Sequence, residues 1–425
     1  MIQIDRNLFL IVTDYPFGIG EPFLEDEIVL LSRHFEKIYL VIPEVNSINK
    51  SLKRFVVPDN CELIELNVSN KLRFKFLSIL GLPSKSTLQE LYNIKFRYHQ
   101  KITLNHLKII IGFKSKALNF KIDLIEYLTR NKIEYKNSVF YSYWFTYATL
   151  GLALLKNKNK KITVTTRMHG WDCFFYRNKL NYLPFRPYVI ENINSVCPIS
   201  ETGKQYLIEK TNSPFREKIH THFLGIGNIP IHLKSNFNPS KIHLVSIAFI
   251  DPIKRLEKIA NALKLITNFD IEWTHIGNEP NNSKSFQNNI EIELRENKNI
   301  KTNFLGEQSK TQIYNFLDRV KPDLLICTST SEGIPVSMME ALAHCIPILS
   351  LNVGGISEIV KDNLNGFLLN SEADENKIAQ KIIEFQNLSL DKRKSLCEES
   401  FQFYLNHFSA EKNYFRFLKQ ELLHE

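Results

Sequence analysis

Apolar runs of strand length alternate with helical segments along almost the whole chain, and this alternation limits the possible folds more than any other feature. Such an order is typical of parallel sheets covered by helices on both faces, so we expect an α/β protein with two doubly wound units. The expected strands are 7–13, 37–43, 138–143, 162–168, 195–200 and 219–224 in the first unit, and 241–249, 271–277, 300–306, 323–329 and 346–351 in the second. The expected helices include 23–35, 201–210, 255–266, 310–320 and 337–345.

The chain has 425 residues, which is too long for one hydrophobic core and predicts two or three domains. A polar stretch at 233–241 contains Asn, Ser and Pro and marks an irregular connection between the units. We therefore expect domains at 1–235 and 236–400. Beyond about residue 390, Phe401, Tyr404, Leu405 and Phe408 recur at helical spacing, which predicts an apolar stripe packed against the body.

Composition narrows the class of protein. Apolar residues make up 44% of the chain and charged residues 23%, which supplies core material and argues against disorder. No C-x-x-C pair occurs and the six cysteines show no metal-ligand spacing with histidines, so a reducing, cytoplasmic setting is expected. The first 16 residues suit a strand better than a signal peptide, and no window reaches the roughly 20 apolar residues that span a bilayer. The cysteines are Cys61, Cys173, Cys197, Cys327, Cys345 and Cys397.

Residues 330–366 carry the strongest functional pattern. An apolar strand ends in a glycine-bearing turn that opens a helix, and Glu332 and Glu340 stand eight residues apart in the turn and about one turn inside the helix. Backbone amides at such a helix start suit a phosphate anion, and the two carboxylates can address different parts of an elongated ligand such as a nucleotide sugar. The turn and helix start comprise Gly333, Ile334, Pro335, Val336 and Ser337.

The segment SEGIPVSMMEALAHCIPIL, followed by GGISEIV and NG, resembles the donor-site signature of the retaining glycosyltransferases of family four, which have the GT-B fold. The resemblance implies two Rossmann-like domains facing a central cleft, with a C-terminal helix (401–425) returning to the N-terminal domain. It also implies that Glu332 binds hydroxyls of the transferred sugar and that Glu340 binds the ribose. The anomeric configuration would be retained, with the leaving phosphate taking the acceptor's proton.

Two loops in the first half follow expected strands, where ligands of open α/β sheets bind. In TDYPFGIGE, Gly18, Gly20 and Glu21 precede a helix, and the loop suits a donor phosphate, a sugar acceptor or an ordinary turn. In PISETGK, Ser200 either caps the next helix or contacts a ligand. The resemblance places a glycine-bearing functional loop at the first position.

The loop RMHGWDCFF brings Arg167, His169 and Asp172 together after the strand 162–168. A histidine there could donate a hydrogen bond to a sugar, although a lone loop histidine is more often structural. The H-G-x-D arrangement resembles the N-domain site of the family, which implies that His169 faces the transferred sugar. Arg167 and Asp172 are expected beside it in the cleft.

Lys254 and Arg255 lie at the start of a helix, where cations oppose the helix dipole and a bound diphosphate would remove the conflict. A solvated pair of charges is the alternative. The family usually has a phosphate-binding arginine five residues before this lysine, where this chain has Phe249, so Arg255 is expected to substitute for it. On the nucleotide side the resemblance assigns Gly277, Leu305 and Gly306.

No D-x-D follows an apolar strand at the donor loops, so the sequence assigns no metal ligand and no cofactor. Lys254, Arg255 and the loop amides would instead balance the charge of a UDP- or GDP-linked sugar. The paired-carboxylate scheme of glycosidases fits this anion-binding loop poorly. A nucleotide-sugar epimerase or hydrolase on the same fold and a non-catalytic sugar-nucleotide-binding protein stay open.

Positive charge is concentrated in one N-terminal segment. Residues 71–136 contain fourteen Lys or Arg against four Asp or Glu, a net charge of +10, whereas the whole chain carries +9. Cations are mixed with Phe, Leu and Ile, which predicts a basic helical insertion that rests on anionic lipid at the inner face of the plasma membrane. A solvated insertion is the alternative, and no RNA-binding signature accompanies the charge. With YPFGIGEPFLEDEI, YSYW and RMHGWD, the chain resembles enzymes of capsule, exopolysaccharide or O-antigen assembly, which implies a glycan or lipid-linked acceptor.

Overall fold

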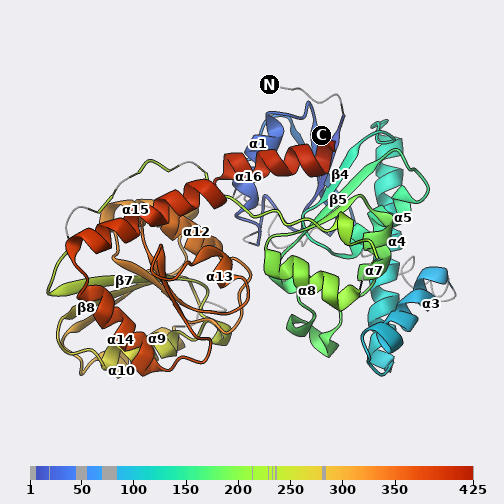
Figure 1. The fold of residues 1–425 in the computed structure, drawn as a ribbon. Helices are drawn as coiled ribbons and strands as arrows, with labels where there is room; N and C mark the ends of the chain where they lie inside the picture. The colour runs from blue at the N-terminus through green and yellow to red at the C-terminus, as the bar shows by residue number, and fades with distance from the viewer. Residues whose placement is uncertain are drawn as a thin grey trace. The chain divides into compact units, whose positions relative to one another are not determined.

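The computed structural model describes residues 6–18, 20–44, 55–68, 84–212, 214–227, 229–231, 233–234, 237–279 and 284–424. The chain forms two compact units: unit 1 comprises Met1–Leu224 with Ala410–Glu425, and unit 2 comprises Gly225–Ser409 (Figure 1). Relative to the expected bounds 1–235, 236–400 and 401–425, unit 2 begins somewhat earlier and keeps the long helix α15 (Leu390–His407). The chain returns to unit 1 only after that helix.

Within the described residues, the sheet of unit 1 has six parallel strands in the order β3-β2-β1-β4-β5-β6. Five of its strands, β1, β2, β4, β5 and β6, are buried along their full length, as expected where helices cover both faces of a parallel sheet. This arrangement confirms the α/β reading of the sequence. The strands are β1 (Leu8–Ile11), β2 (Ile38–Ile42), β3 (Cys61–Glu65), β4 (Val139–Ser142), β5 (Thr163–Met168) and β6 (Ser195–Pro198).

Helices of unit 1 come from both ends of the chain. The C-terminal helix α16 (Ala410–Phe417) packs beside α1, and a π-helical turn, Leu418–Leu423, follows it against β5 (Figure 1). Tyr414, Phe417 and Leu422 are buried there, which confirms the expected return of the chain to its N-terminal domain. The other helices are α1 (Leu24–Ser32), α3 (Lys85–Tyr92), α4 (Leu104–Arg130), α5 (Tyr147–Lys156), α6 (Gly170–Cys173), α7 (Arg186–Asn192) and α8 (Glu201–Thr211).

Unit 2 repeats the architecture with six described parallel strands in the order β12-β11-β10-β7-β8-β9. Its strands are β7 (Lys241–Ile247), β8 (Asp270–Ile276), β9 (Ile300–Phe304), β10 (Leu324–Cys327), β11 (Ile348–Leu351) and β12 (Gly366–Leu369). Its helices are α9 (Leu256–Lys264), α10 (Ser285–Leu294), α11 (Lys310–Val320), α12 (Val336–Ala343), α13 (Ile356–Ile359), α14 (Glu375–Gln386) and α15. The buried Phe401, Tyr404 and Phe408 confirm the predicted apolar stripe of the C-terminal tail.

The basic insertion differs from its prediction. Its long helix α4 turns Ile110, Phe120 and Leu124 into the core of unit 1, so these apolar residues are unavailable to a lipid surface. Lys114 is also buried and donates to the Thr87 hydroxyl at 2.8 Å. The segment 71–83 of the insertion lies outside the described residues. Among the helices that are described, none is long and apolar enough to cross a bilayer.

Candidate functional site

The loop between β10 and α12 has the strand, loop and helix order that the sequence predicts. Glu332 lies in the loop and Glu340 in the second turn of α12, and both side chains are buried. The residue that precedes the helix is Pro335, and within the described part of the chain no side chain caps the first-turn amides. Unpaired amides at a helix start carry partial positive charge and favour an anion. Gly333, Val336 and Ser337 are half-buried around this helix start, whereas Ile334 is buried.

A partly buried ion pair joins the two halves of this site. Lys254, at the end of a short 3-10 turn after β7, places Nζ 2.5 Å from Glu332 Oε1. The Ser329 hydroxyl donates to the same oxygen at 2.7 Å. The carboxylate therefore holds the ammonium group at the head of α12, and the structure brings together residues 78 positions apart that the sequence assigned to one ligand.

Arg255 is the neighbour of Lys254 but makes different contacts. Its φ of 49° is left-handed, and its guanidinium donates from Nε to the Thr328 carbonyl at 2.7 Å and from Nη2 to the Ser329 carbonyl at 3.2 Å. The Thr328 hydroxyl donates back to the Lys254 and Arg255 carbonyls at 3.0 and 2.9 Å. Arg255 thus ties the β7 side of the site to the loop after β10. Phe249, where the family has an arginine, leaves 57% of its surface exposed.

Two glycines of the GGISE segment, Gly354 and Gly355, pack directly against the backbone of the Glu332 loop. Gly354 has a φ of +55°, and a Cβ there would lie 1.9 Å from the Glu332 carbonyl oxygen. A Cβ on Gly355 would lie 2.8 Å from the Gly333 carbonyl oxygen, and the Gly355 amide donates to the Glu332 carbonyl at 3.3 Å. The two backbones approach this closely only because neither position has a side chain.

The carboxyl ends of β7, β8 and β9 lie next to this loop. The Gly277 amide donates to the Gly306 carbonyl at 2.9 Å, and a Cβ on Gly277 would lie 1.8 Å from the Ala248 carbonyl oxygen. The Leu305 amide donates to the His275 carbonyl at 3.0 Å. The three predicted nucleotide-side residues therefore form one surface at adjacent strand ends. Ala248 connects it to a pocket that is also lined by Ser246, Lys254, Ser329, Glu332, Pro335 and Ser337.

In unit 1, Glu21 organises the first loop. Its buried carboxylate accepts the amides of Thr13, Asp14 and Tyr15 at 2.8 to 3.2 Å and the Trp144 indole N–H at 2.6 Å. Burial raises the pKa of this carboxyl group, and the four donors oppose that shift. Gly18 lies against the Asp14 side chain, which occupies the space of a Cβ, and Gly20 lies beside the same carboxylate. Glu21 and both glycines thus shape the loop.

His169 sits at the end of β5 among aromatic rings. Its ring centroid lies 4.1 Å from that of Trp144 and 5.4 Å from that of Phe23. Burial and then the Arg167 charge lower the pKa of His169, so the imidazole is neutral at neutral pH. Within the described residues, neither ring nitrogen has a hydrogen-bond partner. Unpaired buried nitrogens of this kind indicate a group prepared to bind a ligand.

The neighbouring motif residues have structural partners. Asp172 accepts the His169 amide at 2.6 Å and the Phe145 amide at 2.8 Å, and burial raises the pKa of its carboxyl group to about 6. Asp172 therefore fixes the backbone of His169 instead of facing a substrate. Ser200 caps α8, because its hydroxyl accepts a hydrogen bond from the Gly203 amide at 3.0 Å. Of the two roles predicted for Ser200, helix capping and ligand contact, the structure has the first.

Arg167 lies in the core of unit 1 rather than beside His169. Its guanidinium donates to Glu27 Oε1 at 2.8 Å, to the Tyr141 hydroxyl at 2.7 Å and to the His222 carbonyl at 2.9 Å. It also lies 4.3 Å from the Phe417 ring centroid of the C-terminal helix. The sequence shows that an arginine lies near the end of the strand but not which face of the sheet its side chain occupies.

A cavity of about 200 Å³ opens at the carboxyl ends of β1, β2 and β4. Asp14, Glu44, Trp144 and Tyr147 are among its lining residues. Glu44 accepts from Lys116 Nζ at 2.9 Å and from the Tyr147 hydroxyl at 3.1 Å. Carboxylates next to aromatic rings suit the hydroxyls and apolar faces of a sugar. None of these four residues was predicted from the sequence as a site residue, although the motif YSYW contains Trp144.

Comparisons with known proteins agree with this geometry. Residues 229–403 match the family model described as glycosyl transferases group 1. An uncharacterised glycosyltransferase of Methanocaldococcus jannaschii is 28% identical over 251 residues, which cover 59% of this chain and 66% of that protein. An O-antigen biosynthesis glycosyltransferase of Escherichia coli is 25% identical over 210 residues, covering 49% and 56% of the two chains. The matches thus span between half and two thirds of these relatives.

Solved structures share the whole fold. A glycosyltransferase from Rickettsia africae superposes with a TM-score of 0.67 at 15% identity, covering 99% of both chains. The Anabaena protein HepE, solved with UDP and glucose, gives a TM-score of 0.63 at 13% identity over 98% of this chain and 99% of its own. At these identities the likeness concerns the fold. Residues 229–403 thus match the group 1 glycosyltransferases that the motifs resemble, and the two-unit fold is similar to that of solved glycosyltransferases.

Proposed function

We propose that the protein transfers a sugar from a nucleotide-sugar donor to a bacterial surface glycan or its lipid-linked precursor, with retention at the anomeric carbon. One observation carries the donor side of the proposal: the Lys254 ammonium is held by Glu332 beside the uncapped amides of α12. A positive charge and unpaired amides at one point suit the diphosphate of such a donor.

In the proposed reaction the bond between the anomeric carbon and the donor phosphate breaks, and an acceptor oxygen forms a bond to that carbon from the same face. The acceptor's proton passes to the departing phosphate oxygen. Lys254 and the α12 amides stabilise the negative charge that develops on the diphosphate, which is preorganised electrostatic stabilisation. Glu332 binds sugar hydroxyls with its second oxygen, Glu340 binds the ribose, and the neutral His169 imidazole donates to the sugar. This scheme requires no metal ion.

The proposed acceptor site is the cavity of unit 1 lined by Asp14, Glu44, Trp144 and Tyr147. Trp144 also touches His169 and Glu21, so the cavity adjoins the one histidine that we assign to the reaction. The relatives from O-antigen, colanic acid and amylovoran biosynthesis support a glycan acceptor. The donor nucleotide is a UDP or a GDP, and the UDP complexes of HepE favour the first.

Nucleotide release from a panel of UDP- and GDP-sugars, with and without a lipid-linked oligosaccharide, tests the function. We expect acceptor-dependent release and a product whose anomeric configuration, read by NMR, equals that of the donor. Release without acceptor would indicate a hydrolase or epimerase, and binding without turnover would indicate a non-catalytic protein. Glu332→Gln should lower turnover by about 10²-fold or more, because it removes the anchor of Lys254. Glu291→Gln, an exposed change on α10, is the matched control.

We further propose that unit 1 contacts an anionic membrane through α3 and the π-helical turn Asn93–Arg97 that continues it. Leu88, Tyr92 and Phe96 recur every four residues and are 63%, 59% and 54% exposed. Residues at this spacing lie on one face of a helix. The Lys95 ammonium lies 5.2 Å from the Phe96 ring centroid, so a cation borders the apolar face. Apolar side chains bordered by lysine are typical of interfacial helices.

Co-sedimentation with liposomes tests this surface. Binding is expected to vesicles that contain anionic lipid, to weaken with salt, and to fall strongly when Leu88 and Phe96 are both changed to serine. The control changes Ile292, which is 59% exposed on α10 of unit 2, to serine. Equal sedimentation of the double variant and the control would refute the assignment of this surface and would leave the transferase proposal intact.

A further inference from the structure

A second cluster of reactive side chains lies in unit 1, on the strand β6 and the segment beside it. His220 and His222 donate their amides to the Val196 and Pro198 carbonyls, both at 3.0 Å, so this segment runs extended along β6. Alternate residues of an extended segment point to the same side. His220, His222 and the buried thiol of Cys197 therefore come together on one face of the sheet.

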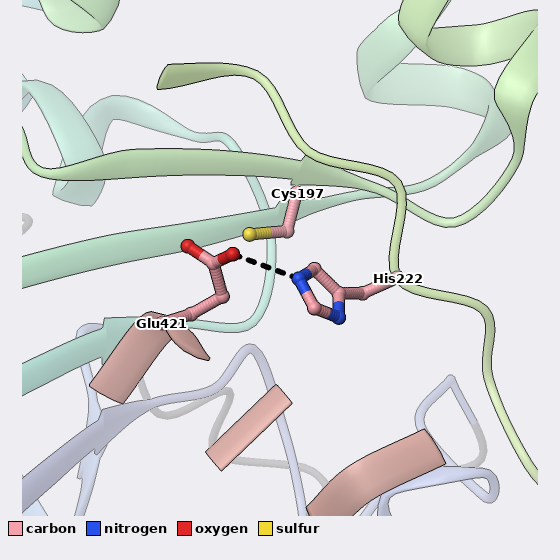
Figure 2. Close-up of side chains that lie close together, drawn as sticks. All are labelled: Cys197, His222 and Glu421. Atoms are coloured by element: carbon pink, nitrogen blue, oxygen red, sulfur yellow. Dashed lines mark hydrogen bonds and ion pairs between the residues drawn. The ribbon is translucent and has the colours of Figure 1, made fainter. Parts of the chain in front are cut away.

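The C-terminal segment supplies a fourth donor. Glu421, in the turn Leu418–Leu423, places Oε1 2.8 Å from His222 Nε2 and 2.8 Å from His220 Nδ1. Figure 2 shows the Cys197 sulfur, the Glu421 carboxylate and the His222 ring close together, with a dashed line joining Glu421 to His222. One ligand atom each from Cys197, His222 and Glu421 lies within 4.8 Å of the other two, and all three residues are buried.

Two further contacts orient these donors. The second ring nitrogen of His220 lies 2.7 Å from the Glu217 carbonyl, which leaves Nδ1 directed at the cluster. The Thr165 hydroxyl donates to the Glu421 carbonyl at 2.9 Å and fixes the turn that carries the carboxylate. Outer hydrogen bonds of this type orient histidine and carboxylate ligands at metal sites.

The charges of the cluster suit a dication. Zinc binding would release the proton of the Cys197 thiol, because thiolate is the form that binds a metal. A thiolate and a carboxylate would then balance two positive charges. The nearby Arg167 is already neutralised by Glu27 at 2.8 Å.

We propose that Cys197, His220, His222 and Glu421 bind a Zn²⁺ ion that fastens the C-terminal segment to the sheet of unit 1. Sulfur and imidazole ligands with one carboxylate select zinc over calcium or magnesium, which take oxygen ligands. Bonds of about 2.0 Å at tetrahedral angles place two ligand atoms about 3.3 Å apart. The 2.8 Å contacts of Glu421 would therefore lengthen by about 0.5 Å, which side-chain rotation allows. The partly exposed His220 gives the ion a path of entry.

Metal content is the first test. The full chain is purified without chelator or affinity-tag metal, and zinc is measured by mass spectrometry. We expect about one zinc ion per chain. Cys197→Ala should lose it, whereas Cys173→Ala, which removes another buried free thiol of unit 1, should keep it. Less than about half an equivalent in the wild type, or equal zinc in both variants, overturns the proposal.

Two measurements remain valid if Cys197→Ala folds poorly. His220→Ala changes a partly exposed residue and should lower the zinc affinity of a folded chain at least tenfold in a competition with a chromophoric chelator. Replacing the metal by Co²⁺ in the wild-type chain should produce a thiolate-to-cobalt charge-transfer band. A Co²⁺ complex without this band, or an unchanged affinity in His220→Ala, contradicts a site built on Cys197 and His220.

Discussion

Replacing Gly354 by alanine tests the idea that the GGISE glycines set the position of Glu332. The new Cβ would lie 1.9 Å from the Glu332 carbonyl oxygen, whereas ordinary contact begins at 3.4 Å, so the two backbones must separate by the difference of 3.4 − 1.9 = 1.5 Å. The φ of +55° adds a strain of about 1–2 kcal/mol for a residue with a side chain. Both effects act on the loop that holds Lys254.

A displacement of about 1 Å at a catalytic group costs on the order of 10²-fold in rate. We therefore expect Gly354→Ala to lower kcat/KM of acceptor-dependent nucleotide release at least 10²-fold, with a loss of stability of about 1–2 kcal/mol in urea unfolding. Gly355→Ala, whose Cβ would lie 2.8 Å from the Gly333 carbonyl oxygen, needs a shift of only 3.4 − 2.8 = 0.6 Å. Its loss of activity should be clearly smaller.

Gly112→Ala is the control for this series. It lies in α4 with no atom within 4 Å of the new Cβ, so activity should be unchanged and stability should rise by about 1 kcal/mol. Circular dichroism confirms that each variant is folded before its rate is compared. Activity of Gly354→Ala within about threefold of the wild type would refute the argument, because the loop would then tolerate a shift that exceeds the precision catalysis requires.

Four further predictions concern other residues. His275 is buried, and burial lowers its pKa to about 4 from the usual 6.5. Between these two pH values the unfolded chain binds more protons than the folded chain, so the free energy of unfolding decreases as the pH falls, by about 2 kcal/mol at pH 5. Urea unfolding of His275→Asn should therefore show a shallower pH dependence than that of the wild type. Lys254→Met should lower kcat about 10²- to 10³-fold in steady-state assays. Phe249→Arg should restore a phosphate ligand and tighten donor binding about tenfold in calorimetry. Trp144→Ala should raise the acceptor KM, while donor affinity measured by calorimetry stays unchanged.

The sequence predicted those strands whose apolar runs are continuous. It missed β3, in which Glu62 and Glu65 are exposed and Ile64 is buried, and β12, which follows the turn at Asn365 and has only four residues. It also predicted a strand at 219–224, where the structure has an extended segment with a single bridge from Ile219 to Val196. Alternation identifies an extended conformation, but a strand also needs a partner along its length, and that partner is set by tertiary structure.

Local motifs were enough to predict that Glu332, Lys254 and the helix start lie together, because the proposed anion site is built from a turn and the amides that follow it. They were not enough for contacts between distant segments. Glu421 lies 199 residues from His222, so spacing along the chain does not reveal the cluster that the two residues share with Cys197. The position of Trp144 against Glu21 and His169 likewise depends on how β1, β4 and β5 pair.

Arg167 connects the site of unit 1 to the C-terminal segment. It stands two residues before His169 on β5, yet its hydrogen bonds go to Glu27 and to the backbone of His222, and its guanidinium lies over Phe417. A buried arginine is stable only while its partners stay in place, since an unpaired buried charge costs several kcal/mol. The C-terminal segment is thus part of the structure that fixes the end of β5, from which the His169 loop begins. A zinc ion at Glu421 would strengthen this same support, because it would bind the segment to the strand next to β5.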